Sequence, residues 1–594
     1  MSGADFTADR RLVWLSLLAI PVGLVCGAMA LLLLRLIGFF TELFYFGRLA
    51  IPHEIVSPAG SPLGLWMIAI PPLGGLIIGL MARYGSDRIR GHGIPEAIEA
   101  ILIGSSRMSP RVAVLKPLSS AISIGSGGPF GAEGPIIMTG GACGSLIAQT
   151  FHLTAAERKT LLVAGAAGGM SATFGTPVAA VLLAVELLLF EWKPRSFVPV
   201  AIASAVAALA RPYLGLAASP LFPVTLHTEA PGLGVLLGAV PAGMIAGFAA
   251  MLLTRAVYAT EDAFARLPIH WMWWPMLGGV VVGIGGWFEP RALGVGYDLI
   301  ADLLRGNYLA SALVPLMLVK ALIWSVALGS GTSGGVLAPL LILGGSLGGL
   351  ESSFMPGGDP ALWPLLGMAS VMGGTMRSPL TGIVFALELT DDVRLLLPLL
   401  IAVVVAHAFT VLVMKRSILT EKVARRGHHV SREYSLDPLE RLLARDVMST
   451  EVITVPASMP VRQLVREYFL GTGAHRHQGY PVVDRKGAPV GMVTKSDLLQ
   501  EWLGALLQDE AADTGPVITW DVASRPALAI GAGDSCRTAA ERMAQSNVGR
   551  LLVVDSNDPK RLLGVITRSD LLKARARALE EESNRERYIR LRSR

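Results

Sequence analysis

The sequence predicts a polytopic α-helical membrane domain followed by a soluble α/β tail. Of the 594 residues, 52% are hydrophobic and only 16% are charged, whereas soluble domains average about 25% charged residues. The mean hydropathy is +0.55, and most of the apolar excess lies before about residue 415. From about 442 to 579 the composition is mixed, and strand-like runs alternate with amphipathic helices.

Charge and cysteine content exclude two kinds of site. The formal net charge of +6 is modest for this length, and Lys and Arg do not form the aromatic-interleaved stripe of a nucleic-acid site. The three cysteines, Cys26, Cys143 and Cys536, are far apart and match no metal-ligand spacing. We therefore expect no nucleic-acid partner, no metal site and no disulfide framework.

The membrane part follows a short segment, residues 1–11. Its first apolar run, Leu12 to Phe40, is too long for the apolar core of a cleavable signal peptide, so it is expected to remain as a membrane helix. Several later runs fall short of the roughly 20 residues that span hydrocarbon, and Gly and Pro interrupt many of them. Such broken segments occur at membrane depth only inside protein or beside water, which is typical of transporters and channels. The later runs lie at about 64–82, 112–150, 160–190, 197–216, 232–254, 271–287, 308–350, 361–389 and 393–414.

Basic residues flank the membrane part at both ends. The positive-inside rule therefore places both ends in the cytoplasm, with an even number of crossings. We expect an integral protein of a bacterial inner membrane, in which a basic linker, 416–441, leads to the tail. The flanking residues are Arg10 and Arg11 before the membrane part, and Lys415, Arg416, Lys422, Arg425 and Arg426 after it.

The membrane part, 12–415, contains two similar halves, roughly 12–220 and 230–415. Residues 176–187 (TPVAAVLLAVEL) resemble residues 378–389 (SPLTGIVFALEL), and in both copies a Glu stands nine positions after the Pro. Duplicated halves commonly place a substrate site at their interface, near the membrane midplane.

Three glycine-rich stretches stand where apolar helices begin: GHGIPE at 91–96, GAEGP at 131–135 and GGVLAP at 334–339. A helix N-terminus exposes unpaired N–H groups and carries roughly half a positive charge. Several such ends that converge in a membrane can bind a small anion without a full countercharge and still release it. The alternative is that these glycines only allow close helix packing.

Taken together and in this order, the three motifs resemble those of the CLC family of chloride channels and transporters, which read GSGIPE, G-K/R-EGP and GxFxP. The resemblance covers about residues 12–420. It implies the CLC fold, with inverted repeats and broken helices, and a homodimer in the lipid bilayer with one pore in each subunit. Chloride or another small anion would be the permeant ion.

Glu133 is the most informative single residue of these motifs. An acid is costly to bury in an apolar helix start, so intramembrane acids usually have a function. The resemblance makes Glu133 the gating glutamate, which occupies an anion site when it is ionised and leaves that site when it is protonated or displaced. It also implies that the anion path is formed by His92, Gly93, Ile94, Pro95, Gly131, Gly134, Val336, Leu337 and Lys415, with backbone N–H groups of Val336 and Leu337 at the central anion.

Four positions in or beside the expected anion path depart from the family pattern. His92 replaces a serine, and can donate an N–H to the anion, become charged and add pH sensitivity, or point away. Leu337 replaces a phenylalanine, Ala132 replaces a basic residue, and Lys415 occupies the slot of the family's central tyrosine. Lys116, ahead of the Glu133 motif, either raises the local positive potential or extends to the membrane interface.

The departure at Leu187 bears on the mechanism. Exchangers of the family carry two consecutive acids here, and the second relays protons, whereas Glu186 is followed by Leu187 in this chain. Leucine cannot carry a proton. We therefore predict voltage- or pH-gated, channel-like chloride conduction with Glu133 as the gate. The alternative is a proton-coupled chloride antiporter of the same family.

The tail contains a second repeat, over 442–508 and 514–579, followed by a charged segment, 580–594. PVVD and GMVTKSDLL in the first copy match LVVD and GVITRSDLL in the second, and each copy reads as strand, turn, strand and capped helix. The pair resembles tandem CBS domains. The resemblance implies that Thr494, Asp497, Thr567 and Asp570 contact an adenine nucleotide, and that the tail regulates the gate. A purely structural or dimer-contacting role is the alternative.

Two other functions find less support in the sequence. His53-Glu54 begins a zinc-protease-like string, but Ser57 occupies the second histidine slot. A cation transporter would need a pathway rich in acids. We expect no enzymatic activity and no required cofactor.

Overall fold

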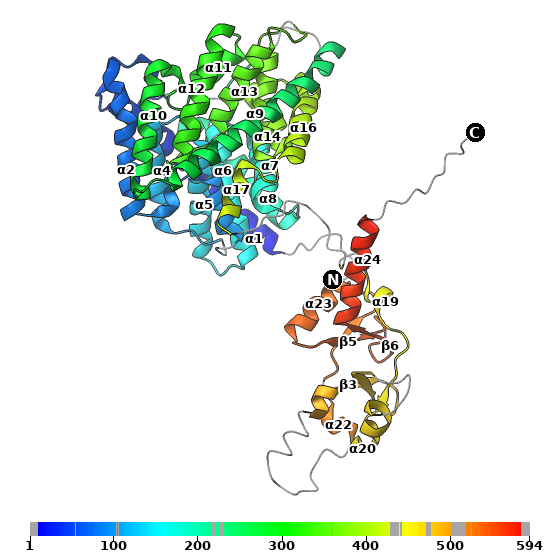
Figure 1. Cartoon of the computed structure of the whole chain (residues 1–594). Coiled ribbons are helices and arrows are strands. Elements are labelled where there is room, and N and C mark those ends of the chain that lie inside the picture. The colour runs from blue at the N-terminus through cyan, green and yellow to red at the C-terminus, as the bar shows by residue number, and fades with distance from the viewer. Residues whose placement is uncertain are drawn as a thin grey trace, which may run out of the picture. The chain divides into compact units, whose positions relative to one another are not determined.

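The computed structural model describes residues 10–53, 55–102, 104, 106–216, 220–224, 231–357, 359–427, 439, 442–470, 477–499, 518–523 and 526–583. Its contacts divide the chain into two compact units, Phe6–Arg432 and a tail from Glu433 (Figure 1). Several predicted segments lie wholly or partly outside the described residues: the first nine residues, Glu54, residues 428–438, 440 and 441 of the linker 416–441, the junction of the two tail repeats and the charged segment after residue 583.

The membrane unit repeats one series of eight helices. The first series is α1 (Arg11–Thr41), α2 (Ile70–Tyr84), α3 (Ile94–Leu102), α4 (Pro110–Gly125), α5 (Glu133–Gln149), α6 (Ala155–Phe174), α7 (Pro177–Leu183) and α8 (Pro194–Ala210). The second is α9 (Leu233–Ala265), α10 (Trp274–Phe288), α11 (Tyr297–Leu304), α12 (Ala310–Gly329), α13 (Leu337–Glu351), α14 (Leu362–Met376), α15 (Pro379–Thr390) and α16 (Leu396–Val413). A last helix, α17 (Ile418–Arg425), follows them.

Proline and short polar caps set where these helices begin. Pro177 and Pro379 are the first residues of α7 and α15. Proline costs no helix hydrogen bond at this position, because the N–H of a first residue has no acceptor within the helix. Thr154 and Glu157 form a capping box at the start of α6, which satisfies two N–H groups. The sequence thus fixes the helix starts locally.

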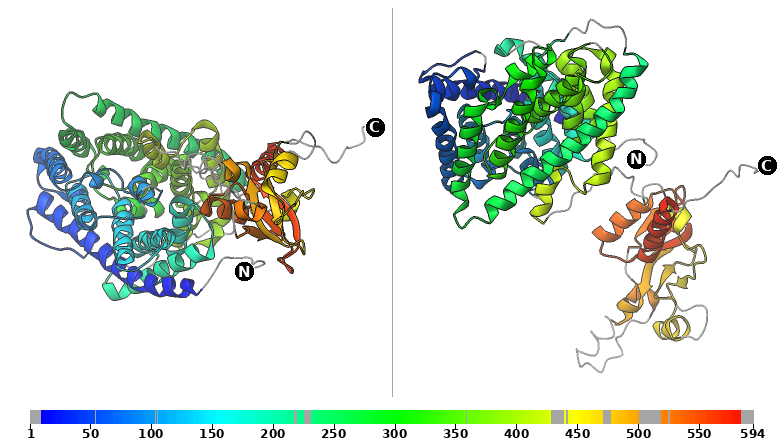
Figure 2. Two further views of the ribbon diagram at one scale, coloured as in Figure 1. Left: turned by 90° about the horizontal axis from the view of Figure 1, so that it is seen from below. Right: turned by 45° about the horizontal axis from the view of Figure 1, so that its top comes forward.

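The two halves pack on each other reciprocally. A Cβ atom on Gly279 would lie 2.5 Å from the Pro71 carbonyl oxygen of α2, and one on Gly75 would clash with the Pro275 carbonyl oxygen of α10. Within each half, α5 packs on α6 and α13 on α14 through close backbone approach at glycines. The predicted duplicated fold of helices is confirmed, and Figure 2 shows its helices from two further sides.

Helices of very different length make up this unit. In the described part, five helical stretches are long and apolar enough to cross a membrane. Four shorter apolar stretches accompany them: Pro177–Leu189, Pro194–Ala210, Leu337–Glu351 and Pro379–Thr390. The predicted broken helices are therefore present.

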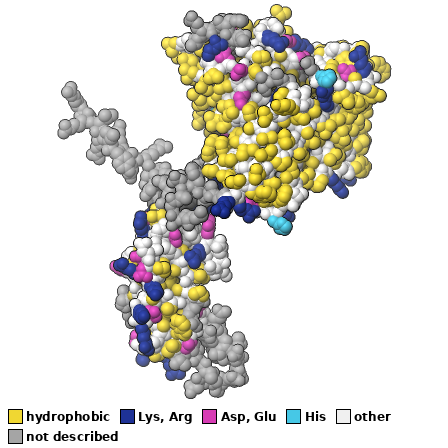
Figure 3. Space-filling view, turned by 180° about the vertical axis from the view of Figure 1, so that it is seen from behind, with side chains coloured by type: hydrophobic (Ala, Val, Ile, Leu, Met, Phe, Trp, Pro, Cys, Tyr) yellow, Lys and Arg dark blue, Asp and Glu magenta, His cyan; other side chains and the backbone are white. Residues whose placement is uncertain are grey.

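The outer surface of the membrane unit matches its apolar composition. Figure 3 shows a face covered with hydrophobic side chains, with most charged side chains gathered toward its two ends. Large apolar residues are widely exposed there, among them Leu412 at 85% and Trp66 at 78%. A surface this apolar fits lipid rather than water.

The tail contains two small sheets of the same design. In the first, β1 (Val455–Pro456) pairs in parallel with β2 (Gly479–Val483), which pairs antiparallel with β3 (Pro489–Thr494). In the second, β4 (Ala529–Gly531), β5 (Arg550–Val554) and β6 (Leu562–Thr567) repeat that order and those directions. The accompanying helices are α19 (Ala444–Val447), α20 (Val461–Leu464), α22 (Thr519–Val522), α23 (Cys536–Gln545) and α24 (Arg568–Ser583).

Each sheet packs against the opening segment of the other repeat. Ala444, from the start of the first repeat, lies in the core of the second sheet, and Val522, from the start of the second repeat, lies in the core of the first sheet. Hydrogen bonds between Ser449 and Val565 join the same elements. The two repeats therefore form one intertwined unit.

Candidate anion site

The three glycine-rich stretches, distant in sequence, meet in the membrane unit. Gly335 N–H donates to the Gly131 carbonyl at 3.0 Å, and Gly334 N–H donates to the Gly91 carbonyl at 3.4 Å. The second and third stretches begin α5 and α13, so the N-termini of these two helices face each other across the interface of the halves.

Glycine is required where the stretches touch. A Cβ atom on Gly134 would clash with the His92 carbonyl oxygen, and one on Gly93 would lie 2.5 Å from the Gly134 carbonyl oxygen. Gly93 also has a φ of +89°, which side chains with a Cβ rarely adopt. Close packing at these glycines is therefore what brings the stretches and the helix N-termini together.

The Glu133 carboxylate lies between the two N-termini. Its side chain is completely buried, and its Oε1 accepts a hydrogen bond of 3.0 Å from the Ala338 N–H. The N–H groups of Glu133 itself and of Leu337 also interact with it. A negative group thus sits where exposed N–H groups and the positive ends of two helices favour an anion.

His92 and the start of α3 complete this arrangement. The His92 side chain is buried, and its Nδ1 has no hydrogen-bond partner among the described residues. Ile94 and Pro95 are the first two residues of α3 and are buried. Glu96 Oε2 accepts from the Gly93 N–H at 2.9 Å, so this helix start is capped by its own carboxylate.

Lys116 anchors the first stretch from within. Its fully buried Nζ donates to the carbonyls of Ile89 (2.9 Å) and Gly91 (2.8 Å) and to Ser333 Oγ (3.0 Å). Of its two sequence readings, extension to the interface is therefore wrong, because the ammonium group lies in the core. Lys116 ties the first stretch to the third.

The second half has a matching lysine clasp, that is, a buried Lys whose Nζ donates to backbone carbonyls of a glycine-containing stretch. The sequence analysis did not single it out. Lys320 Nζ, also fully buried, donates to the Ala292 carbonyl at 2.8 Å and to the Gly294 carbonyl at 3.2 Å. It holds the stretch Gly294-Val295-Gly296-Tyr297, the counterpart of Gly91-His92-Gly93-Ile94. The signal was present in the repeat, since Lys320 stands in α12 where Lys116 stands in α4.

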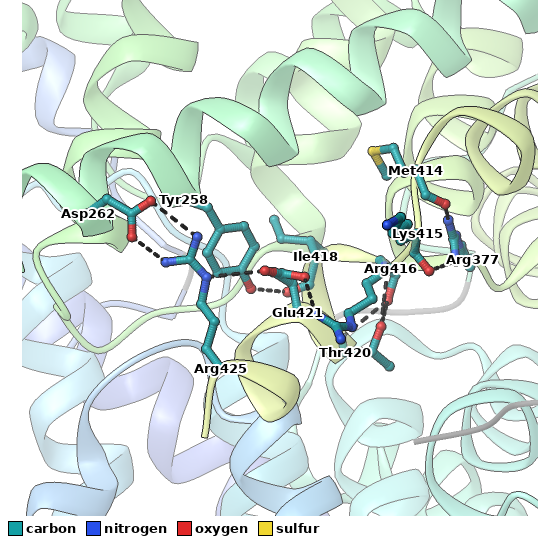
Figure 4. A network of polar contacts seen from close by, with 11 residues as sticks. Tyr258, Asp262, Arg377, Met414, Lys415, Arg416, Ile418, Thr420, Glu421 and Arg425 are labelled. Carbon is teal, nitrogen blue, oxygen red and sulfur yellow. Dashed lines mark hydrogen bonds and ion pairs between the residues drawn. The ribbon is translucent and has the colours of Figure 1, made fainter. Parts of the chain in front are cut away.

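Lys415 lies apart from the residues grouped around Glu133. Its side chain is exposed, and its backbone carbonyl accepts a hydrogen bond of 3.3 Å from Arg377 (Figure 4). Met414, just before it, accepts another from the same guanidinium. The structure therefore does not bring Lys415 together with the other predicted anion-site residues.

The relay position next to Glu186 is filled by a buried leucine. Leu187 is fully buried, whereas the Glu186 carboxylate accepts from the Leu380 N–H (3.2 Å) and the Thr381 N–H (2.9 Å) at the start of α15. Glu388 caps α7 in the same way, through the N–H groups of Val178 and Ala179. The two repeated acids thus cap helices across the interface of the halves.

The four predicted nucleotide residues of the tail form two identical pairs. Thr494 donates its N–H and hydroxyl to Asp497, both at 2.8 Å. Thr567 donates likewise to Asp570, at 2.9 and 2.7 Å. Each pair begins the helix that follows the last strand of its repeat.

In the described part of the chain, no group of three or more His, Cys, Asp or Glu side chains is placed to hold a metal ion.

Comparison with known proteins agrees with this architecture. The family model described as voltage gated chloride channel matches residues 74–411, and the CBS domain model matches residues 444–504 and 519–577. The chain is 32% identical to an H(+)/Cl(−) exchange transporter ClcA of Vibrio campbellii over 59% of this chain and 79% of that protein. It is 31% identical to the ClcA of Citrobacter koseri, over 57% of this chain and 75% of that protein.

Solved structures share the fold. A slow cyanobacterial Cl−/H+ antiporter superposes with a TM-score of 0.59 at 22% identity, over 70% of this chain and 98% of that one. A eukaryotic CLC transporter superposes with a TM-score of 0.56 at 18% identity, over 94% of this chain and 97% of that one. Because the family model matches more than half of the chain, and the motifs of that family meet around Glu133, the chain belongs to the family of voltage gated chloride channels, the CLC family, and carries a tandem CBS pair.

Proposed function

We propose that this protein exchanges chloride for protons across a membrane, with Glu133 as both the gate and the outer proton site. The observation that carries the proposal is the position of the Glu133 carboxylate, which the N-terminal N–H groups of α5 and α13 hold as they would hold an anion. Relatives named as exchange transporters favour exchange over the channel-like conduction that the sequence suggested.

Competition between two anions supplies the coupling. When Glu133 is ionised, its carboxylate fills the positive site between the helix N-termini and competes with chloride for it. Protonation removes the charge that these N–H groups stabilise, so the side chain leaves and chloride enters. Because a site that holds one anion rejects the other, protons and chloride move in alternation.

Passive conduction is the second candidate, and Leu187 favours it. A buried leucine cannot carry protons, and the neighbouring Glu186 carboxylate is engaged by the α15 N-terminus. Exchange therefore requires protons to reach Glu133 by another route, for which ordered water is the simplest carrier.

Purified protein in liposomes separates the two candidates. Under a chloride gradient, with potassium and valinomycin clamping the voltage, chloride efflux and proton uptake are recorded together. Uphill proton uptake driven by chloride establishes exchange, whereas chloride flux without proton movement establishes conduction.

Glu133→Gln is expected to abolish proton movement while chloride flux survives. Glu351→Gln is the matched control, because it removes another buried carboxylate, at the far end of α13, and is expected to leave both fluxes intact. Loss of all flux in a folded Glu133→Gln protein would contradict the assignment of Glu133 as the gate.

We further propose that the CBS pair regulates transport through α17. Lys422 Nζ and Arg426 Nη2 each lie 3.2 Å from Glu96 Oε1, and Glu96 in turn holds the Gly93 N–H. Arg425 pairs with Asp262 and Glu421, and the Tyr258 hydroxyl donates to the Ile418 carbonyl (Figure 4). The last helix before the tail is thus fixed to the first anion-binding stretch, and an adenine nucleotide at the Thr494 and Thr567 pairs would act along this route.

Family membership also supports a proposal on assembly and location. We propose a homodimer in a bacterial inner membrane, with both termini in the cytoplasm. Exposed apolar side chains on α16, such as Leu397 at 51% and Val404 at 46%, offer an apolar face for a second subunit or lipid.

A further inference from the structure

Two buried polar atoms near the gate lack partners and complement each other. Glu133 Oε2, an acceptor, and the Tyr297 hydroxyl, a donor, have no hydrogen-bond partner among the described residues. Gly296, the residue before Tyr297, packs against Ile342 in the first half of α13, the helix whose start holds the Glu133 carboxylate, and Tyr297 and Glu133 interact electrostatically. Buried polar groups are normally paired, so two neighbouring exceptions of opposite kind indicate a contact that forms in another state of the gate.

Packing holds the Tyr297 ring, while its hydroxyl has no hydrogen-bond partner in the part of the chain that the structure describes. Tyr297 begins α11, after Gly296 with a φ of +76°, in the stretch that Lys320 anchors. Its ring packs edge-on against Phe174 and Phe222, with centroids 6.2 and 6.1 Å apart. The packing of the ring thus sets the position of the hydroxyl.

A buried cation lies near the same hydroxyl. Arg211 is 3% exposed and donates to the Ala172 carbonyl, and it also interacts electrostatically with Tyr297. Its charge makes the surroundings of the hydroxyl favourable to a negative group and unfavourable to a second cation.

We propose that the Tyr297 hydroxyl receives the Glu133 carboxylate when chloride displaces it from the Ala338 N–H. Resting on the proposed role of Glu133 as the gate, this makes Tyr297 a positioning residue. An ionised carboxylate that leaves the helix N-termini needs a new donor, because an unpaired buried charge is very unfavourable. Tyr297 supplies that donor, and the positive charge of Arg211 stabilises the displaced group, so chloride can bind before the proton arrives.

A double-mutant cycle on chloride binding tests this inference. Tyr297→Phe keeps the ring and removes only the hydroxyl, so we expect the chloride dissociation constant, measured by titration calorimetry, to rise about tenfold. In a Glu133→Gln background no ionised carboxylate has to be received, so the same change should alter binding less than about twofold. Tyr308→Phe is the control, since its hydroxyl already donates to the Pro360 carbonyl.

Each outcome decides the inference. An equal loss of affinity in both backgrounds would show that Tyr297 only supports the structure, and unchanged binding in Tyr297→Phe would overturn the proposal outright. Because the readout is binding rather than proton flux, a failure here is distinct from a failure of proton-coupled exchange. Dimeric elution and retained binding in Tyr308→Phe confirm that the variants fold.

Discussion

Two glycines beside Glu133, Gly131 and Gly335, leave the space in which its carboxylate lies. Its carboxylate lies over Gly131, and a Cβ on Gly335 would lie 2.7 Å from Glu133 Oε1. The space that these glycines leave is the space the carboxylate fills. A methyl group at Gly335 would therefore displace the carboxylate, and it would keep any other anion out of the same space.

Lys116→Met is expected to lower stability by about 2 kcal/mol or more, because it removes the Lys116 donor from the buried Ile89 carbonyl and leaves the Gly91 carbonyl with only the 3.4 Å bond from the Gly334 N–H. Thermal unfolding of the detergent-solubilised protein measures this. Ser120→Ala is the matched control. It removes one of several bonds to Ser333, which keeps Lys116 and Ser119 as partners, so we expect a much smaller loss. Equal losses in the two variants would refute the clasp.

Cys536 is expected to react slowly with alkylating reagents at neutral pH. Burial, with a smaller effect of Asp446, raises the pKa of its thiol from 9.0 to about 11. The reactive thiolate is then about 100-fold scarcer at pH 7 than in an ordinary thiol, and its fraction rises as the pH approaches 11. Labelling of a Cys26→Ala, Cys143→Ala chain against free cysteine checks this, and equal rates at pH 7 would contradict it.

At the scale of elements, short helices are stable here because other helices surround them. Buried α5 and α13 would be too short to cross a bilayer alone, and their exposed N–H groups would be unsatisfied in lipid. Each packs along a neighbour through backbone contacts at glycines, as at Gly140 with Gly165 and Gly344 with Gly367. Close packing thus makes a helix N-terminus available inside the membrane unit.

Gly140→Ala is expected to destabilise the fold by about 1–3 kcal/mol, because its Cβ would clash with the Gly165 carbonyl oxygen of α6. The adjacent Gly141→Ala is the control. Its Cβ would meet Leu162 at 3.4 Å, an ordinary contact, and alanine favours the helix by about 1 kcal/mol. Thermal unfolding in detergent should therefore separate the two variants, and a Gly140→Ala protein as stable as Gly141→Ala would contradict the packing argument.

At the scale of the whole molecule, α17 is the last helix before the tail and is the element through which we propose that the tail acts on the membrane unit. Lys422 in α17 and Arg426, just after it, both pair with the Glu96 carboxylate. The Glu96 side chain is only 4% exposed. Partly buried pairs of this kind are screened less than surface pairs. A shift of α17 would therefore be felt at Gly93.

Removing the tail after residue 432 is expected to change chloride turnover, and Lys422→Met is expected to suppress most of that change. We expect this because the proposed route runs through the Glu96 carboxylate, which Lys422 of α17 contacts directly. Arg416→Met is the control, since Arg416 pairs with the partly exposed Glu421 instead. Liposome flux of the four combinations measures the coupling. An undiminished effect of truncation in Lys422→Met would show that the tail acts by another route.

The sequence by itself determined the class of the fold, the two repeats and the family motifs, because hydropathy, proline placement and repeated glycine patterns are local properties. Glu133 is recognisable in the same way, as an acid in an apolar helix start.

Only the tertiary structure decided which groups meet. The Lys116 and Lys320 clasps, the carboxylate on the Ala338 N–H, the Glu186 and Glu388 caps, and the neighbouring Glu133 and Tyr297 join segments distant along the chain. Lys415 was assigned to the anion path only by a short sequence match, and in the structure it lies apart from these residues. Contacts between the halves depend on how closely their backbones approach in three dimensions. The spacing of residues along the sequence does not encode that approach.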